Sequence, residues 1–335
     1  MSKLTTNLSI LFGLALLMLT GCEQNTTVVL PQPGEEPAEV LFSARIAQVE
    51  VSTRANYVPQ ETFLENDEIG LFGWKTETIK NENQYLGNVK LVSDAGGSNL
   101  TSDGQKIYFP VQTQILSLCA YYPYSDTEVS GTKVNIKSEL ETTEAYNSYI
   151  KDPLWGQTSV DKPTSSTPAT AEFNMAHRMG RLKIYVYKDA GVALAYYLKS
   201  IKVVFYNKQV GTMDITNGEI SATNTTVATY TDSYESPELS TEATGDPQYD
   251  HTILPSKTEA TGSVVKSITI TIASIAEGVV PESAGNYEIY NAEATGSTAI
   301  KPKNGDVTRV NVKFNPSTMT KASIGNWSDE EVLNI

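Results

Sequence analysis

The 335-residue sequence predicts an all-β protein, and two observations carry this prediction. The chain contains 18 tyrosines and is rich in threonine, valine and isoleucine, whose aromatic or branched side chains fit the half-buried surface of a pleated strand. Apolar and polar residues alternate over many short runs, which is the period of a strand with one buried face. No segment keeps a helical period over three turns, and residues 139–149 are the best candidate for a short helix.

Composition and charge exclude several classes of protein. Apolar residues make up 40% and charged residues 19%, which favours a globular chain, and the length favours two domains. The 39 acidic residues outnumber the 25 basic ones, so a net charge of -14 repels phosphate backbones and excludes nucleic-acid binding. Two histidines and two cysteines are too few for a multi-ligand zinc site or a disulfide framework. We therefore expect no metal and no cofactor.

The N-terminus is typical of a signal peptide over residues 1–21. Lys3 precedes an apolar run at 8–19, which as a helix reaches only about 18 Å, short of the roughly 30 Å needed to span a bilayer. The run ends in Leu-Thr-Gly-Cys22, a pattern that looks like a bacterial lipobox and predicts a lipid on the Cys22 thiol. We favour lipidation over an ordinary buried thiol because the polar, proline-containing residues 22–39 follow as a flexible spacer.

Short strands are predicted from residue 40 onward, in the order of the chain. Their apolar positions are Val40, Phe42, Ala44 and Ile46; Val49 and Val51; Ile69 and Leu71; Ile107 and Phe109; Leu116 and Leu118; Val134 and Ile136; Leu182, Ile184 and Val186; Ile201, Val203 and Phe205; Ile268, Ile270 and Ile272; and Val310, Val312 and Phe314. Glycine, asparagine and aspartate mark the turns between them. The polar stretch 157–170 predicts a boundary that separates residues 40–165 from 166–335, each the size of one β-sandwich.

Motifs for catalysis are missing from the sequence. Neither His177 nor His251 has a catalytic spacing around it, and a packed histidine is the favoured interpretation of His177. The acidic clusters at 67–68 and 329–331 lack a calcium-loop pattern and are interpreted as solvated turns. Cys119 lies in an apolar run and is interpreted as a core thiol. We therefore predict no enzyme and no catalytic residue.

Several segments, taken in order, resemble the fimbrillin family, two-domain lipoprotein pilins of Bacteroides-type bacteria that assemble into type V pili. They are the lipobox, 52–55 (STRA), 66–72 (NDEIGLF), 120–124 (AYYPY), 152–156 (DPLWG), 173–182 (FNMAHRMGRL), 253–256 (ILPS) and 324–327 (IGNW). The resemblance spans nearly the whole chain. It implies two transthyretin-like Greek-key β-sandwich domains in tandem, export to the outer membrane as a lipoprotein, and a place in a surface fimbrium.

The resemblance also implies a route of assembly with other pilin subunits. An arginine-specific protease would cut after Arg54, leaving Ala55 as the new N-terminus and removing the first strand. A strand from another subunit would then fill the groove by β-augmentation. The sequence supports this mapping, because a strand-forming stretch at 40–51 lies between the spacer and Arg54, although Arg54 as an ordinary surface charge stays an alternative.

Several alternatives stay open from the sequence alone. The tail at 317–335 is either the donated strand or a final edge strand of its own domain, and stalk, tip and anchor positions are not separated. The tyrosines at 121–124 fit strand-end packing better than a carbohydrate platform. A monomeric surface lipoprotein that binds a glycan or a host protein, through the loops at 121–124 or 221–236, is the alternative function. A β-sandwich glycosidase would need two carboxylates roughly 5–10 Å apart.

Overall fold

The computed structural model describes residues 38–47, 62–77, 79–102, 105–110, 112–164, 167–242, 245–255, 264–274, 289–296, 304–316, 323–324 and 332–334. The regular structure of these residues is β-strand apart from two single 3-10 turns, η1 (Asn81–Asn83) and η2 (Glu144–Tyr146). The all-β class is thereby confirmed. The candidate helix at 139–149 was wrong, because only the η2 turn forms there. Within the described part of the chain, no helix has the length and apolarity to cross a membrane.

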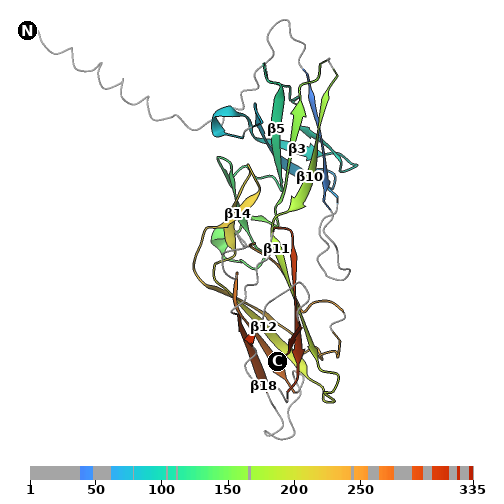
Figure 1. Ribbon diagram of the computed structural model, residues 1–335, viewed down its shortest axis with the longest axis vertical. Helices are drawn as coiled ribbons and strands as arrows, with labels where there is room; N and C mark the ends of the chain where they lie inside the picture. The colour runs from blue at the N-terminus through green and yellow to red at the C-terminus, as the bar shows by residue number, and fades with distance from the viewer. Residues whose placement is uncertain are drawn as a thin grey trace, which may run out of the picture.

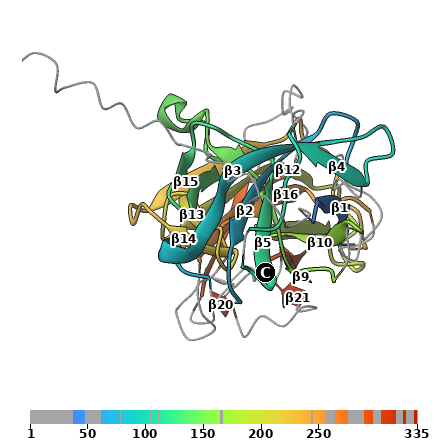
Figure 2. The same ribbon diagram turned by 90° about the horizontal axis from the view of Figure 1, so that it is seen from above.

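The first part of the chain forms a closed barrel, seen from above in Figure 2. Its strands are paired in the order β1-β10-β9-β5-β2-β3-β4, and β1 closes the ring between β10 and β4. Their bounds are β1 (Val40–Ile46), β2 (Glu68–Trp74), β3 (Gln84–Ser93), β4 (Asn99–Ser102), β5 (Ile115–Tyr122), β9 (Leu154–Asp161) and β10 (Ala169–His177). Alternating apolar side chains fill the interior, among them Ile69, Leu71, Leu116 and Leu118, which are all fully buried.

The last part of the chain forms a sandwich of two sheets over one core. One sheet has the order β16-β11-β19-β21 and the other β15-β12-β17-β18-β20. Their bounds are β11 (Gly180–Lys188), β12 (Tyr197–Phe205), β15 (Ala228–Ser233), β16 (Tyr249–Ile253), β17 (Val265–Ala273), β18 (Ile289–Gly296), β19 (Val307–Phe314), β20 (Ser323–Ile324) and β21 (Val332–Asn334). Leu182 and Ile184 of the first sheet pack with Ile201 and Val203 of the second.

A third sheet joins the barrel to the sandwich, and Figure 1 shows it between them along the long axis of the molecule. Strand β7 from the first half of the chain pairs antiparallel with β13 from the second half. The bounds are β6 (Val129–Ser130), β7 (Lys133–Lys137), β8 (Ile150–Lys151), β13 (Val210–Asp214) and β14 (Glu219–Ala222). The side chains beneath this sheet form a separate core with the outer face of β2 and β5, through Phe72, Trp74 and Tyr121.

The observed sheets can be compared with two finer predictions, the two tandem sandwich domains and the boundary between residues 165 and 166. The hydrogen bonding closes the N-terminal strands into a barrel, so two tandem transthyretin-like sandwiches are not confirmed. The division at residues 165 and 166 stays a prediction. By its strand pairing β10 lies in the barrel, and the chain passes from barrel to sandwich between His177 and Gly180.

Candidate functional site: strand β1 in the barrel wall

Strand β1 is the first strand, which the predicted cleavage after Arg54 would remove from the subunit. Its sequence Val-Leu-Phe-Ser-Ala-Arg-Ile alternates apolar and more polar residues, and the structure turns Val40, Phe42, Ala44 and Ile46 into the barrel, each 3–6% exposed. Leu41 faces outward and is 46% exposed. The predicted alternation of this strand is therefore confirmed.

Hydrogen bonds hold β1 on both of its edges. Along one edge it runs parallel to β10, in register from Val40 with Ala169 to Ile46 with Met175. Along the other edge the Val40 amide donates to the Ile107 carbonyl at 2.8 Å, the Phe109 amide donates to the Ala38 carbonyl at 2.9 Å, and two residues pair with β4. Strand β1 is thus a member of the barrel wall with a neighbour on each side.

The side chains around β1 form a continuous apolar lining. Phe173, Met175 and Ala171 of β10 are buried in the same cluster as the inward residues of β1, and so are Leu100 of β4 and Phe109. These side chains lose their common neighbour if β1 leaves. The apolar side chains that now surround Phe42 and Ile46 would then line an open groove between β10 and β4.

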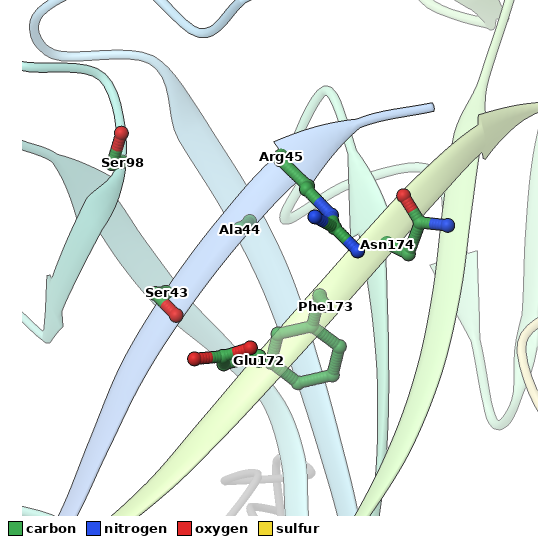
Figure 3. A pocket seen from close by; sticks show the side chains of 7 residues that line it. All are labelled: Ser43, Ala44, Arg45, Ser98, Glu172, Phe173 and Asn174. Atoms are coloured by element: carbon green, nitrogen blue, oxygen red, sulfur yellow. The ribbon is translucent and has the colours of Figure 1, made fainter. Parts of the chain in front are cut away.

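A hollow of about 290 Å³ lies over the end of β1 that is nearer to Ala47. Figure 3 shows Arg45 of β1 reaching across toward Asn174 of β10, with Glu172 farther along the same face and Ser98 on the other side of β1. The residues that line it are Ser43, Ala44, Arg45, Ser98, Glu172, Phe173 and Asn174. Its rim is therefore polar.

The predicted processing residues are not placed by the structure. Cys22, Arg54 and Ala55 lie outside the described residues, so lipidation and cleavage stay predictions. In the described part of the tail, β20 pairs with β18 and β21 pairs with β19, each at the edge of a sandwich sheet. Residues 323–324 and 332–334, the described parts of the tail, therefore pair within their own chain.

The other residues considered from sequence have structural partners. Burial raises the pKa of the Cys119 thiol to about 12, so it stays protonated and unreactive at neutral pH. The buried Tyr121 donates from its hydroxyl to Asn88 Oδ1 at 2.7 Å, and Tyr122 packs against Phe63 at 5.3 Å between ring centroids. The packing interpretation of the tyrosines therefore holds for this pair.

The two histidines each lie beside carboxylates. His177 Nδ1 is 3.0 Å from Asp152 Oδ2, and both side chains are largely buried, which agrees with a packed histidine. His251 lies between Glu139 and Asp232, a cluster that the sequence analysis missed because its members come from three distant segments. Among the described residues no group of three or more histidine, cysteine, aspartate or glutamate side chains could hold a metal ion.

Comparison with known proteins gives a consistent result. A family model described as fimbrillin-like matches residues 53–327. Fim1C of Bacteroides uniformis, named as a candidate fimbrium subunit, is 28% identical over 178 residues, which are 52% of this chain and 54% of that protein. The match thus spans about half the length of this curated relative.

Solved structures also resemble the chain. A crystal structure of a candidate cell adhesion protein from Bacteroides ovatus has a TM-score of 0.52 at 16% identity, covering 89% of this chain and all of the other. One from Bacteroides uniformis, also a candidate cell adhesion protein, has a TM-score of 0.48 at 17% identity, covering 85% of this chain and 95% of the other. The first of these supports a shared fold.

Proposed function

This chain belongs to the fimbrillin-like family, and from that premise we propose that it is a fimbrial subunit that assembles by exchange of a β-strand between copies. The family is one of structural fimbrial subunits and not of enzymes, and it implies a surface appendage built with other pilin subunits. In our proposal the precursor is lipidated at Cys22 and held at the outer membrane. Cleavage after Arg54 then gives a mature chain that begins at Ala55.

The position of β1 in the barrel wall is the observation that carries this proposal. A strand at the outer edge of a sheet leaves no deep slot when it is lost, whereas β1 has a hydrogen-bonded neighbour on each edge. Its loss would expose unpaired backbone groups on both β10 and β4. An extended segment of another subunit can satisfy these groups by β-augmentation.

The inward side chains of β1 explain why the empty groove would be refilled. Full burial of Val40, Phe42 and Ile46 contributes about 5–9 kcal/mol when each large apolar side chain contributes about 1.5–3 kcal/mol. A barrel without β1 lacks this stabilisation, and its apolar lining is exposed to water. A donated strand with alternating apolar residues would restore both the hydrogen bonds and the buried area.

Cleavage by an arginine-specific protease tests the proposal. We expect the full-length chain, purified in detergent, to be cut after Arg54 and then to form ladders on gels run without boiling. Arg54→Gln should remain uncut and monomeric. Arg45→Gln is the matched control and should be cut like the wild type, because Arg45 lies within the hydrogen-bonded strand β1, which a protease reaches only after local unfolding. If the cleaved wild-type protein stays monomeric, assembly by strand exchange is contradicted. The alternative function, a surface lipoprotein that acts as a monomer, would then be favoured.

A further inference from the structure

We propose that strand β15 of the sandwich is a docking edge for a second copy of this chain, and that two copies join by antiparallel pairing of β15 with β15. The sheet β15-β12-β17-β18-β20 would then continue from one copy into the other. This contact holds copies side by side and requires neither cleavage nor exchange of β1. Three features carry it: an unpaired edge, the lack of blocking residues, and a self-complementary order of side chains.

The outer edge of β15 has unpaired backbone groups. Strand β15 pairs with β12 alone, in an uninterrupted antiparallel register. The Tyr234 amide donates to the Lys199 carbonyl at 2.9 Å, so by alternation the amides and carbonyls of Thr229, Thr231 and Ser233 point away from β12. Within the described part of the chain no hydrogen bond satisfies these groups. The side chains of the three residues are exposed, which leaves this edge accessible to another strand.

Strand β16, at the edge of the other sandwich sheet, shows how an edge is blocked. The amide of Thr252 donates to Glu139 Oε1 at 3.0 Å, and its carbonyl accepts a hydrogen bond from the Ser138 hydroxyl. A further strand could pair at Thr252 only by displacing both side chains. Lysine, proline and bulges protect edges in other proteins. Residues 221–234 contain no lysine and no proline, and the pairing of β15 with β12 has no bulge.

The same edge carries little charge. Copies of a chain with a net charge of -14 repel each other, so a contact between them needs a surface with few charges. Asp232 is the only charged residue in the stretch 221–234. Its Oδ2 lies 2.8 Å from His251 Nε2, so this carboxylate already has a partner within its own chain. Pairing along β15 therefore brings no bare like charges together.

The order of side chains along β15 is self-complementary. A two-fold axis at Thr231 places this residue opposite its own copy and Thr229 opposite the partner's Ser233, which uses all three unpaired residues. Threonine and serine pairs across neighbouring strands are favourable. On the other face Tyr230 meets the partner's Asp232, a phenol opposite a carboxylate. An axis at Asp232 would instead oppose two carboxylates, which is unfavourable. These matches favour a second copy as the occupant.

Exposed apolar surface lies at one end of this edge. Val227 directly precedes β15 and Tyr206 directly follows β12, and their side chains are 48% and 43% exposed. A second copy paired along β15 would cover part of this surface and so add apolar burial to the backbone hydrogen bonds. One strand pair still makes a small interface, and we therefore expect a weak dimer with a dissociation constant in the micromolar range.

A cysteine at the two-fold axis tests the pairing in the full-length, uncleaved chain. Opposed Cα atoms in an antiparallel pair lie about 4.5–5.5 Å apart, within reach of a disulfide. We expect Thr231→Cys to form a disulfide-linked dimer on mild oxidation. Lys202→Cys is the matched control, because it is exposed on the same face but lies one strand farther in, so the two copies would be roughly 15 Å apart.

The wild type measures any cross-linking through the native cysteines. Equal dimer yields from Thr231→Cys and Lys202→Cys, or no dimer from Thr231→Cys above the wild-type background, would overturn the inference. Failure of the cleaved chain to form ladders would count against the proposed exchange of β1 and would leave this contact untouched, because the test uses the uncleaved chain.

Charge pairs across the axis test the register. Thr229→Lys with Ser233→Lys opposes lysines in both pairs, whereas Thr229→Lys with Ser233→Glu opposes lysine with glutamate. Sedimentation equilibrium in density-matched detergent gives the dissociation constants. We expect the first variant to weaken the dimer about tenfold or more and the second to stay within about threefold of the wild type. Equal weakening by both would overturn the register, and a wild type that stays monomeric up to about 1 mM would overturn the contact itself.

Discussion

At the scale of single residues, His251 shows how the fold creates a charged site from separate segments. Its Nδ1 is 3.1 Å from Glu139 Oε1 and its Nε2 is 2.8 Å from Asp232 Oδ2. A carboxylate only accepts hydrogen bonds, so both ring nitrogens must donate and the imidazole is charged. Burial alone lowers the pKa of His251, but the hydrogen bonds to Asp232 and Glu139 overcome it and raise the pKa to about 9.

This geometry predicts a pH-dependent contribution to stability. Because the folded pKa lies above the ordinary value of 6.5, the stabilisation is fully present below about pH 6.5 and is lost as the pH rises toward 9. We expect His251→Gln to cost about 2 kcal/mol at pH 6 and clearly less at pH 9.5, a figure reduced for partial exposure. Urea unfolding at the two pH values measures this difference. A cost that does not change with pH would contradict the charged state.

At the scale of elements, β1 shows what an alternating sequence does in a barrel wall. Its inward residues share the interior with β10 and β4, whereas its outward residues remain at the surface. A single strand therefore has one face that stabilises the fold and one that contributes little. Neighbouring positions on this strand should differ sharply in their cost of truncation.

Alanine substitutions at two adjacent positions of β1 test this difference. Phe42→Ala should lower the free energy of unfolding by about 3–5 kcal/mol, because it leaves a cavity in the barrel. Leu41→Ala, at a side chain that is 46% exposed, should cost less than about 1 kcal/mol. Denaturant unfolding of the uncleaved chain gives both values. Similar costs would mean that β1 does not face the core as described.

At the scale of the whole molecule, the third sheet makes the barrel and the sandwich depend on each other. Strand β7 pairs with β13 over five residues, and Trp155 Nε1 of the barrel donates to the Ile215 carbonyl at 2.7 Å. Arg178, between the barrel and the sandwich, lies 4.5 Å from the Trp155 ring and donates to the Asn217 carbonyl at 3.2 Å. Gly218 follows with a φ of 69°, and a side chain there would collide with Arg178.

Calorimetry tests this dependence. We expect the uncleaved chain to unfold in one transition whose calorimetric and van't Hoff enthalpies agree. Met213→Asp places a charge in the buried core beneath the third sheet and should split the transition into two. Thr212→Asp, on the less buried face of the same strand, is the control and should keep one transition. Two transitions in the wild type would show that the halves unfold independently.

The sequence by itself determined the features that depend on near neighbours along the chain. It predicted the all-β class, the inward positions of β1 and the burial of Cys119, because side-chain alternation and local apolar runs do not require a partner. It also predicted a strand at Ile107 and Phe109; these side chains are buried, but the segment forms only an isolated bridge through Tyr108. The resemblance to fimbrillins, carried by short motifs along the chain, was confirmed by the family match.

Only the tertiary structure decided which strands are neighbours. The pairing of β1 with β10, of β7 with β13, and the meeting of His251 with Asp232 and Glu139 all join residues far apart in sequence. Many strands of this chain carry the same alternation, so the pattern gives no preference among partners. Packing of the complete barrel and sandwich selects one arrangement, and with it decides that β1 lies inside the wall and not at an edge.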